Sequence, residues 1–132
     1  MHKSFYASGF LYHSPSQQIL LQQSTHKNLL NFDLFKGKGH NNTDPKIVFQ
    51  QCVEKALGLS IAPSSVHAVY DYVHDTDGVQ FIFYIEVKKN IPDEGWILLS
   101  KVSKYSMSEQ ARHDIIIGER VIHSHMPAVN PK

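Results

Sequence analysis

Residues 37–59, GKGHNNTDPKIVFQQCVEKALGL, decide the fold because they predict a loop, a helix and a sharp helix end in that order. Asp44 followed by Pro45 is a typical helix start. The aspartate side chain can accept hydrogen bonds from backbone N–H groups, and proline at the first helical position loses an N–H that has no helical partner. Gly58 favours the left-handed conformation that commonly ends a helix. The stretch therefore predicts a helix over residues 45–57.

Apolar residues recur inside this helix at roughly helical spacing, which predicts one buried face. The residues expected on the inner face are Ile47, Val48, Cys52, Ala56 and Leu57. Those expected to face outward are Lys46, Gln50, Gln51, Glu54 and Lys55.

A cationic, glycine-rich segment, Lys36-Gly37-Lys38-Gly39-His40, precedes the helix and is predicted as a flexible loop. Backbone N–H groups, the helix dipole and two lysines would together attract a phosphate group to this end of the helix. An ordinary glycine-rich turn with solvated lysines explains the same residues. Both interpretations stay open at the level of the sequence.

The rest of the chain alternates strands with a second helix. Strands are predicted over residues 4–13, 17–23, 29–35, 66–74, 79–87 and 96–102. Both faces of residues 79–87 are largely apolar, which predicts a central strand covered on both sides. Ser106-Met107-Ser108-Glu109 forms a capping box that opens a second helix, in which Gly118 costs ~1 kcal/mol. The inner face of that helix is expected to contain Ala111, Ile115, Val121 and Ile122.

Strands, helix, strands and helix in this order predict an α/β/α sandwich with a mixed sheet. A length of 132 residues suits a single domain over residues 1–132. The tail over residues 126–132, which contains Pro127 and Pro131, is expected to be loose.

The bulk composition excludes several classes of protein. A net charge of +1 gives no global attraction to nucleic acid or to an anionic membrane, so an anion site must be local. A single cysteine, Cys52, excludes an intramolecular disulfide and a cysteine-based zinc site. No signal peptide or membrane span is predicted, and the expected location is the cytoplasm.

The frame of residues 37–59 resembles the Nudix box of the MutT-like Nudix hydrolase superfamily, whose pattern is G-x5-E-x7-R-E-U-x-E-E-x-G-U with U aliphatic. Gly37, Val53, Gly58 and Leu59 occupy the matching positions with no gap. The family's glutamates and arginine are replaced by Thr43, Gln51, Cys52, Lys55 and Ala56. In the family those glutamates bind divalent cations that activate water and neutralise a pyrophosphate. The resemblance therefore implies a Nudix-like fold around a degenerate active site.

The residues in and near the box allow alternative roles. Lys55 would repel a divalent cation and could contact a phosphate directly, or it is an exposed lysine without a partner. Cys52 is a soft ligand or nucleophile, or a small buried hydrophobic residue. Glu94 is the candidate general base by resemblance to Nudix enzymes, or part of a solvated turn. Glu54 lies about 100° around the helix from the family's glutamate pair and is expected at the surface.

The histidines indicate no metal site. His113 and Asp114 are adjacent on a helix and point apart, so they cannot form a relay. His123 and His125 could hold a metal together, but no third ligand follows at a fitting spacing.

Three functions remain. The first is a Nudix-like protein that binds a nucleotide or other phosphorylated small molecule with little or no metal-dependent hydrolysis and no expected cofactor. Its ligand would contact Lys36, Gly37, Lys38, His40 and Lys55. The second is an active pyrophosphohydrolase that cleaves a nucleoside diphosphate linked to another moiety. It would use Mg²⁺ or Mn²⁺ held by Glu54, Glu86 or Glu94. The third is a protein-interaction module on the same scaffold.

Overall fold

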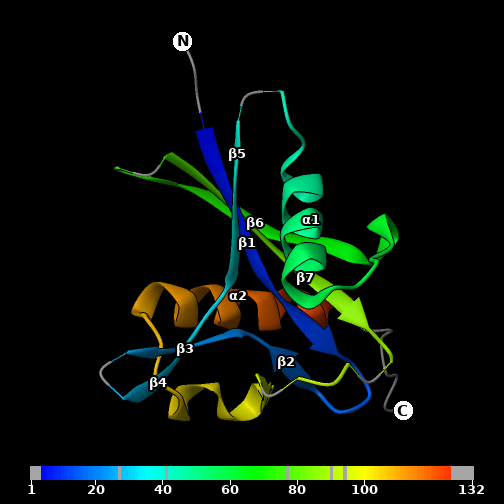
Figure 1. Ribbon diagram of the computed structural model, residues 1–132, viewed down its shortest axis with the longest axis vertical. Helices are drawn as coiled ribbons and strands as arrows, with labels where there is room; N and C mark the ends of the chain where they lie inside the picture. Colours follow the sequence, from blue (N-terminus) through cyan, green and yellow to red (C-terminus); the bar gives the residue numbers. More distant parts are fainter. Residues whose placement is uncertain are drawn as a thin grey trace.

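A mixed β-sheet forms the middle layer of the protein (Figure 1). The computed structural model describes residues 4–26, 28–40, 42–76, 78–89, 91–93 and 95–125. The main path of the sheet runs in the order β6 (Val66–His74), β7 (Gly78–Val87), β1 (Ser4–His13), β2 (Gln18–Leu20) and β8 (Trp96–Leu98). Strand β5 (Phe35–His40) pairs with the first part of β1, and β2 pairs with its last part. Strands β3 (Gln22–His26) and β4 (Leu29–Asp33) form a separate antiparallel pair.

One helix covers each face of the sheet, so the predicted α/β/α sandwich is confirmed. Helix α1 (Pro45–Leu57) packs on one face, and helix α2 (Glu109–His125) packs on the other. Strand β7 is central, with β1 parallel on one side and β6 antiparallel on the other. Its odd-numbered residues, such as Phe83 and Ile85, face α1, whereas Ile82 and Tyr84 face α2. The expectation of a strand covered on both sides is therefore confirmed.

Helix α1 begins and ends as predicted. The Asp44 carboxylate accepts a hydrogen bond from the Lys46 backbone N–H at 3.0 Å, and Pro45 is the first helical residue. Gly58 ends the helix with a φ of 68°. Its backbone N–H donates to the carbonyl oxygen of Glu54 at 2.8 Å, which closes the last turn.

The predicted inner face of α1 is confirmed for Val48, Cys52 and Leu57, which are partly buried against the core, and is wrong for Ile47 and Ala56. The buried residues are Phe49 and Val53, and the Phe49 ring stacks on Phe83 with the ring centroids 5.7 Å apart. Ile47 is 37% exposed, and Ala56 is also exposed. The physical reason is that burying one phenylalanine ring against the sheet removes more apolar surface from water than burying Ile47 or Ala56.

Glu54 is half-buried and anchors a loop, although it was expected at the surface. Its carboxylate accepts a hydrogen bond from the Ile61 backbone N–H at 2.7 Å. The Gln50 side chain donates to the Ile61 carbonyl oxygen at 2.9 Å. These two contacts hold the segment between α1 and the short 3₁₀ helix η1 (Pro63–Ser65) against the helix.

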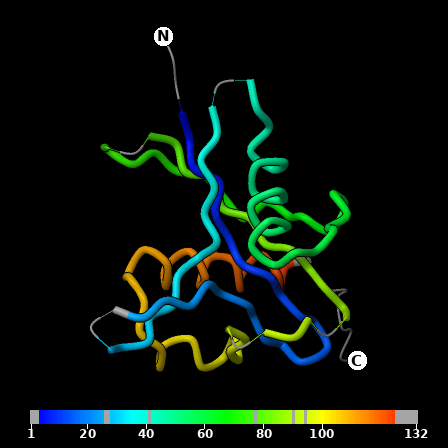
Figure 2. Tube along the Cα trace, in the orientation of Figure 1, coloured from blue at the N-terminus to red at the C-terminus, as the bar shows by residue number. Residues whose placement is uncertain are grey.

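The glycine-rich segment before α1 is a strand and not a loop. It forms β5, pairs with β1, and is followed by α1, which returns alongside it (Figure 2). A Cβ on Gly37 would lie 3.1 Å from the Cβ of Cys52, and a Cβ on Gly39 would lie 2.3 Å from the Phe5 ring. The two glycines therefore serve close packing of a strand against a helix and a ring.

Other predicted boundaries also shift. The strand predicted over residues 17–23 divides at Leu21 into β2 and β3, and β3 takes in part of the expected polar loop. The strand predicted over residues 29–35 divides into β4 and β5. The strand predicted over residues 96–102 stops at Leu98 and continues as a 3₁₀ helix, η2 (Leu99–Lys104). The tail over residues 126–132 lies outside the described residues.

Ser108, and not Ser106, caps helix α2. The Ser108 hydroxyl oxygen accepts a hydrogen bond from the Ala111 backbone N–H at 3.1 Å. The Ser106 hydroxyl instead donates to the Asn31 side-chain oxygen at 3.1 Å. The cap moves because a tertiary contact with β4 engages the first serine of the motif.

Gly118 of α2 sits directly against the Phe10 ring. A Cβ at this position would lie 2.7 Å from Cζ and 2.9 Å from Cε2 of Phe10, which is fully buried. We expect Gly118→Ala to lower the free energy of unfolding by up to about 2 kcal/mol, because overpacking of about 1–3 kcal/mol outweighs a gain of about 1 kcal/mol in helix propensity. Urea unfolding measures the change.

The Phe10→Leu background provides the control for this clash. In that background Gly118→Ala should be neutral or stabilising, since the ring is gone. Stabilisation by Gly118→Ala in the otherwise unaltered protein would contradict the packing argument.

Candidate functional site

The predicted box positions gather on one side of α1. A pocket of about 420 Å³ lies beside the helix between α1 and β5. Its lining residues are Gly37, Lys38, Gly39, His40, Thr43, Val48, Gln51, Cys52 and Lys55. The four helical members follow the i, i+3, i+4, i+7 spacing that places side chains on one stripe of a helix. Of the residues predicted to bind the ligand or to replace the family's glutamates and arginine, Lys36 and Ala56 do not line this α1-side pocket.

Lys36 and Lys38 lie together over Tyr6 on the α2 side of the sheet. The Lys36 ammonium is 4.8 Å and the Lys38 ammonium 5.9 Å from the centroid of the Tyr6 ring. Because alternate residues of a strand share a face, the two lysines project in the same direction from β5. Tyr6, Lys36 and Lys38 therefore form a cationic cluster at the sheet edge, and Lys38 also borders the α1-side pocket.

The helix start is less open to an anion than the sequence implies. The Asp44 carboxylate already accepts from the Lys46 N–H. The turn before it is closed by a hydrogen bond from the Thr43 N–H to the His40 carbonyl at 3.0 Å, and the His40 N–H donates to the Thr43 hydroxyl oxygen at 3.1 Å. Several backbone N–H groups at this end of α1 are therefore already engaged, and lysine side chains supply the formal positive charge beside it.

Cys52 is half-buried beside β5. Burial raises the pKa of the Cys52 thiol, while the Lys36 backbone group that contacts it acts in the opposite direction and does not cancel the rise. A thiol with a raised pKa is protonated at neutral pH and is a poor nucleophile. This environment favours the role of a small packed residue.

The acidic residues considered as metal ligands do not converge among the described residues. Glu54 is bound to Ile61, and Glu86 acts on Tyr12 and Tyr84 on the α2 face, where its charge helps to raise their pKa values. Glu94 lies outside the described residues. Within the described parts of the chain, no group of three histidine, cysteine or acidic residues is placed to hold a metal ion.

A second, polar pocket lies between the sheet and α2, and sequence reasoning missed it. Its volume is about 120 Å³. Its lining residues are Ser8, Asp33, Leu34, Lys36, Tyr72, Gln80, Ile82, Ser108, Gln110, Ala111 and Asp114. Lys36 connects this α2-side pocket to the cationic cluster on β5.

Two side chains of the α2-side pocket have buried polar atoms without a partner. Ser8 is 2% exposed and Gln80 is 4% exposed, and neither the Ser8 hydroxyl oxygen nor Nε2 of Gln80 has a hydrogen-bond partner among the described residues. A buried polar group left unpaired costs about 1–3 kcal/mol. Such groups are therefore suited to pair with a molecule that enters the pocket.

Asp114 is held at the α2 wall of this pocket and is 2% exposed. The Tyr70 hydroxyl donates to its Oδ1 at 2.5 Å, and the Gln110 amide donates to the same oxygen at 2.9 Å. Burial raises the pKa of the Asp114 carboxyl, and these two hydrogen bonds oppose the rise without cancelling it. Burial and the adjacent Asp114 also raise the pKa of Tyr70.

One sequence signal could have found this pocket. Ser8, Gln80 and Asp114 are polar residues, and each lies on a face of its strand or helix whose other residues are mostly apolar and buried. Polar residues at core positions are uncommon unless they are paired or functional. The sequence shows which residues of β1 and β7 share a strand face. It does not show that this face packs against α2.

Solved structures with a similar fold include MutT and Nudix proteins. No protein-family model and no curated protein matches the chain. A MutT structure from work on Aliivibrio salmonicida and Vibrio cholerae is similar with a TM-score of 0.66 and 12% identity, over 86% of this chain and 97% of that one. A mutT/nudix family protein from Listeria innocua matches with a TM-score of 0.67 and 10% identity, over 92% and 95%.

The NUDIX domain of Shewanella oneidensis NrtR, in a complex with ADP ribose, is also similar. The TM-score is 0.61 and the identity 14%, over 90% of this chain and 86% of that one. At these identities the likeness concerns the fold, and the chain has the Nudix fold. None of the helices in the described part of the chain is long and apolar enough to cross a membrane.

The raised pKa of Asp114 predicts a pH-dependent loss of stability. The folded state binds the Asp114 proton more tightly than the unfolded chain, so this contribution is complete below the ordinary pKa of 3.8 and is lost as the pH rises through the raised pKa. Asparagine keeps an acceptor for Tyr70 and does not titrate. We expect the stability of the unaltered protein to fall, relative to Asp114→Asn, as the pH rises from about 3 to about 7.

Urea unfolding at a series of pH values measures this difference. The matched control is Glu109→Gln, which removes an exposed carboxylate from the same helix. A stability difference between Asp114→Asn and the unaltered protein that does not vary with pH would contradict the assignment.

Proposed function

We propose that this Nudix-fold protein binds a nucleotide or another phosphorylated small molecule, with little or no metal-dependent hydrolysis. The observation that carries the proposal is the position of β5. This strand borders the α1-side pocket through Lys38 and His40, and it borders the α2-side pocket through Lys36. Cations at the junction of two pockets can bind phosphate groups while another part of the same ligand enters either pocket.

In this proposal the phosphate groups bind at the edge of β5, beside Lys36 and Lys38 over Tyr6, and they extend toward His40 and Lys55. The organic part of the ligand enters the α2-side pocket, where Ser8 and Gln80 have unpaired polar atoms. The ADP ribose complex of the Shewanella oneidensis NrtR domain supports the choice of a nucleotide-like ligand. The unpaired polar atoms favour a small-molecule site over a scaffold that serves protein interaction alone.

The chemistry of the α1-side pocket supports binding without hydrolysis. Metal-assisted attack on a pyrophosphate requires an ion that activates water and offsets the developing charge. The described residues of this pocket supply a protonated thiol and lysine ammonium groups, and they include no carboxylate. Glu54 and Glu86, considered for an active hydrolase, lie outside this pocket, and Glu86 is on the other face of the sheet.

Titration with ADP tests the binding function. We expect Lys38→Ala and Lys55→Ala each to weaken ADP binding about tenfold or more, because a hydrogen bond to a charged group contributes about 1.5–3 kcal/mol. Lys101→Ala, which changes an exposed lysine on η2, is the matched control and should leave the Kd unchanged. Calorimetry gives the Kd values, and amide chemical shifts locate the ligand.

A variant of the α2-side pocket separates the two parts of the ligand. Gln80→Leu should weaken binding of ADP but not of inorganic phosphate, and it should cost the fold little stability, because it removes a buried amide nitrogen that has no hydrogen-bond partner among the described residues. Shifts confined to residues distant from β5, or equal affinities for ADP in all variants, would refute the proposed site.

The catalytic part of the proposal predicts no hydrolysis of ADP ribose above background with Mg²⁺ or Mn²⁺. Replacing Cys52, Lys55 and Ala56 together with glutamate should create tight divalent binding, which calorimetry with Mn²⁺ can detect. Single replacements should not, because Mg²⁺ and Mn²⁺ sites need several oxygen ligands. Metal-dependent turnover by the unaltered protein, abolished by a chelator and by Glu94→Gln, would instead establish the hydrolase alternative.

A further inference from the structure

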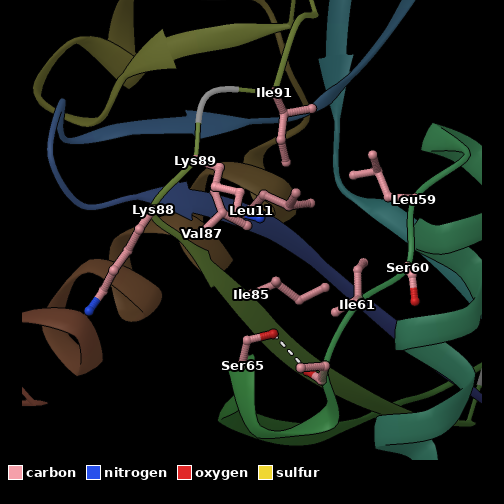
Figure 3. A pocket seen from close by; sticks show the side chains of 11 residues that line it. Leu11, Leu59, Ser60, Ile61, Ser65, Ile85, Val87, Lys88, Lys89 and Ile91 are labelled. Atoms are coloured by element: carbon pink, nitrogen blue, oxygen red, sulfur yellow. Dashed lines mark hydrogen bonds between the residues drawn. The ribbon is translucent and has the colours of Figure 1, made fainter.

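An apolar cavity of about 480 Å³ lies near the far end of α1 from the helix start (Figure 3). It is enclosed by the ends of β1 and β7, by the segment from α1 to η1, and by Ile91. Its lining residues are Leu11, Leu59, Ser60, Ile61, Ala62, Ser65, Ile85, Val87, Lys88, Lys89 and Ile91. None of them lines the α1-side or α2-side pocket.

The floor of this cavity is aliphatic and buried. Leu11 and Ile85 are fully buried, and Ile61 is 8% exposed. Figure 3 shows Ile61, Ile85, Ile91 and Leu59 around one space. A volume of this size and a mostly apolar lining with few polar groups are typical of small-molecule sites.

The wall formed by the η1 segment is held by hydrogen bonds. Glu54 and Gln50 of α1 bind the Ile61 backbone N–H and carbonyl oxygen. The Ser65 hydroxyl donates to the Ala62 carbonyl oxygen at 2.7 Å, as Figure 3 shows. This wall of the cavity is therefore preformed, and a ligand need not order the η1 segment in order to bind.

The charge around the cavity is positive. Two exposed lysines, Lys88 and Lys89, are among its lining residues, and none of the lining residues that the structure describes is acidic. The Lys88 ammonium points away from the cavity in Figure 3. Lys89 is therefore the residue best placed to supply a charge at the rim.

We propose that this cavity binds an aliphatic carboxylate of medium chain length. The alkyl chain would lie against Leu11, Ile61 and Ile85, and the carboxylate would remain at the rim beside Lys89. An alkyl chain suits the aliphatic floor, and an anionic head group suits a rim where Lys89 supplies a positive charge and the described lining residues include no carboxylate. This ligand differs from the proposed phosphorylated ligand and uses none of its residues, so either site can fail without the other.

A chain-length series tests the apolar part of the site. Titration with hexanoate, octanoate and decanoate should show the Kd falling about fourfold per added CH₂ group until the cavity is filled, from about 0.8 kcal/mol per buried CH₂. Methyl chemical shifts should change first at Leu11, Ile61 and Ile85. A Kd that does not depend on chain length, or shifts elsewhere in the protein, would overturn the proposal.

Two pairs of variants locate the site. Ala62→Phe should fill the cavity and weaken octanoate binding at least tenfold, whereas Ala56→Phe, on an exposed face of α1, should not. The extended backbone of Ala62, with φ of −71° and ψ of 132°, accepts phenylalanine without strain. Lys89→Ala should weaken octanoate binding about twofold to fivefold, as expected for an exposed charge pair, and Lys88→Ala should not.

Alternative occupants give different results. Octylamine binding as tightly as octanoate would refute the role of the rim charge. If the cavity instead receives a second copy of the chain, sedimentation should show a dimer that Ala62→Phe disrupts, and octanoate should not bind the monomer. Should Ala62→Phe fail to fold, the chain-length series and the pair of lysine variants still decide between these outcomes.

Discussion

The parallel pairing of β1 with β7 is the constraint on which the rest of the structure depends. Gly9 of β1 makes it possible, because a Cβ at this position would lie 1.9 Å from the Phe83 carbonyl oxygen and 2.9 Å from the Phe49 ring. Parallel strands require a long crossover between them, and here the crossover contains α1. The two strands are buried on both faces, so they separate one core under α1 from another under α2.

The same pairing places the functional groups. Tyr6 and Ser8 of β1, Lys36 of β5 and Gln80 of β7 all project toward α2 because they share the same phase of strand alternation. Most of this face is apolar and packs beneath α2. Ser8, Lys36 and Gln80 line the α2-side pocket together with Asp114 of the helix. The Ser8 hydroxyl oxygen and Nε2 of Gln80 have no hydrogen-bond partner in the described part of the chain, which costs stability and leaves both atoms available to the proposed ligand.

Helix α1 borders the two proposed binding sites through different stripes of its surface. Cys52 and Lys55 border the α1-side pocket, whereas Gln50 and Glu54 bind the η1 segment that forms one wall of the apolar cavity. Glu54 is the acidic residue nearest in sequence to the family's glutamate positions, and its contacts give it a structural role. Because successive residues of a helix are rotated by about 100°, Gln50 and Glu54 point in a different direction from Cys52 and Lys55.

The sequence by itself determined the elements that depend on local chemistry. Asp44, Pro45 and Gly58 set the bounds of α1, and the apolar residues on both faces of residues 79–87 predicted a central strand. The order of elements and the frame of the box were enough to predict the Nudix-like sandwich. Each of these predictions rests on residues close together in the chain, where capping and periodicity act directly.

Tertiary structure alone decided which residues meet. The glycine-rich segment became a strand because β1 was available to pair with it, and Phe49 became the buried residue of α1 because Phe83 lay opposite. The α2-side pocket joins Ser8, Gln80 and Asp114, which are far apart in the chain. No local sequence pattern specifies that these distant residues lie together. Their proximity follows from strand order and helix packing, and both are fixed only when the whole core is buried.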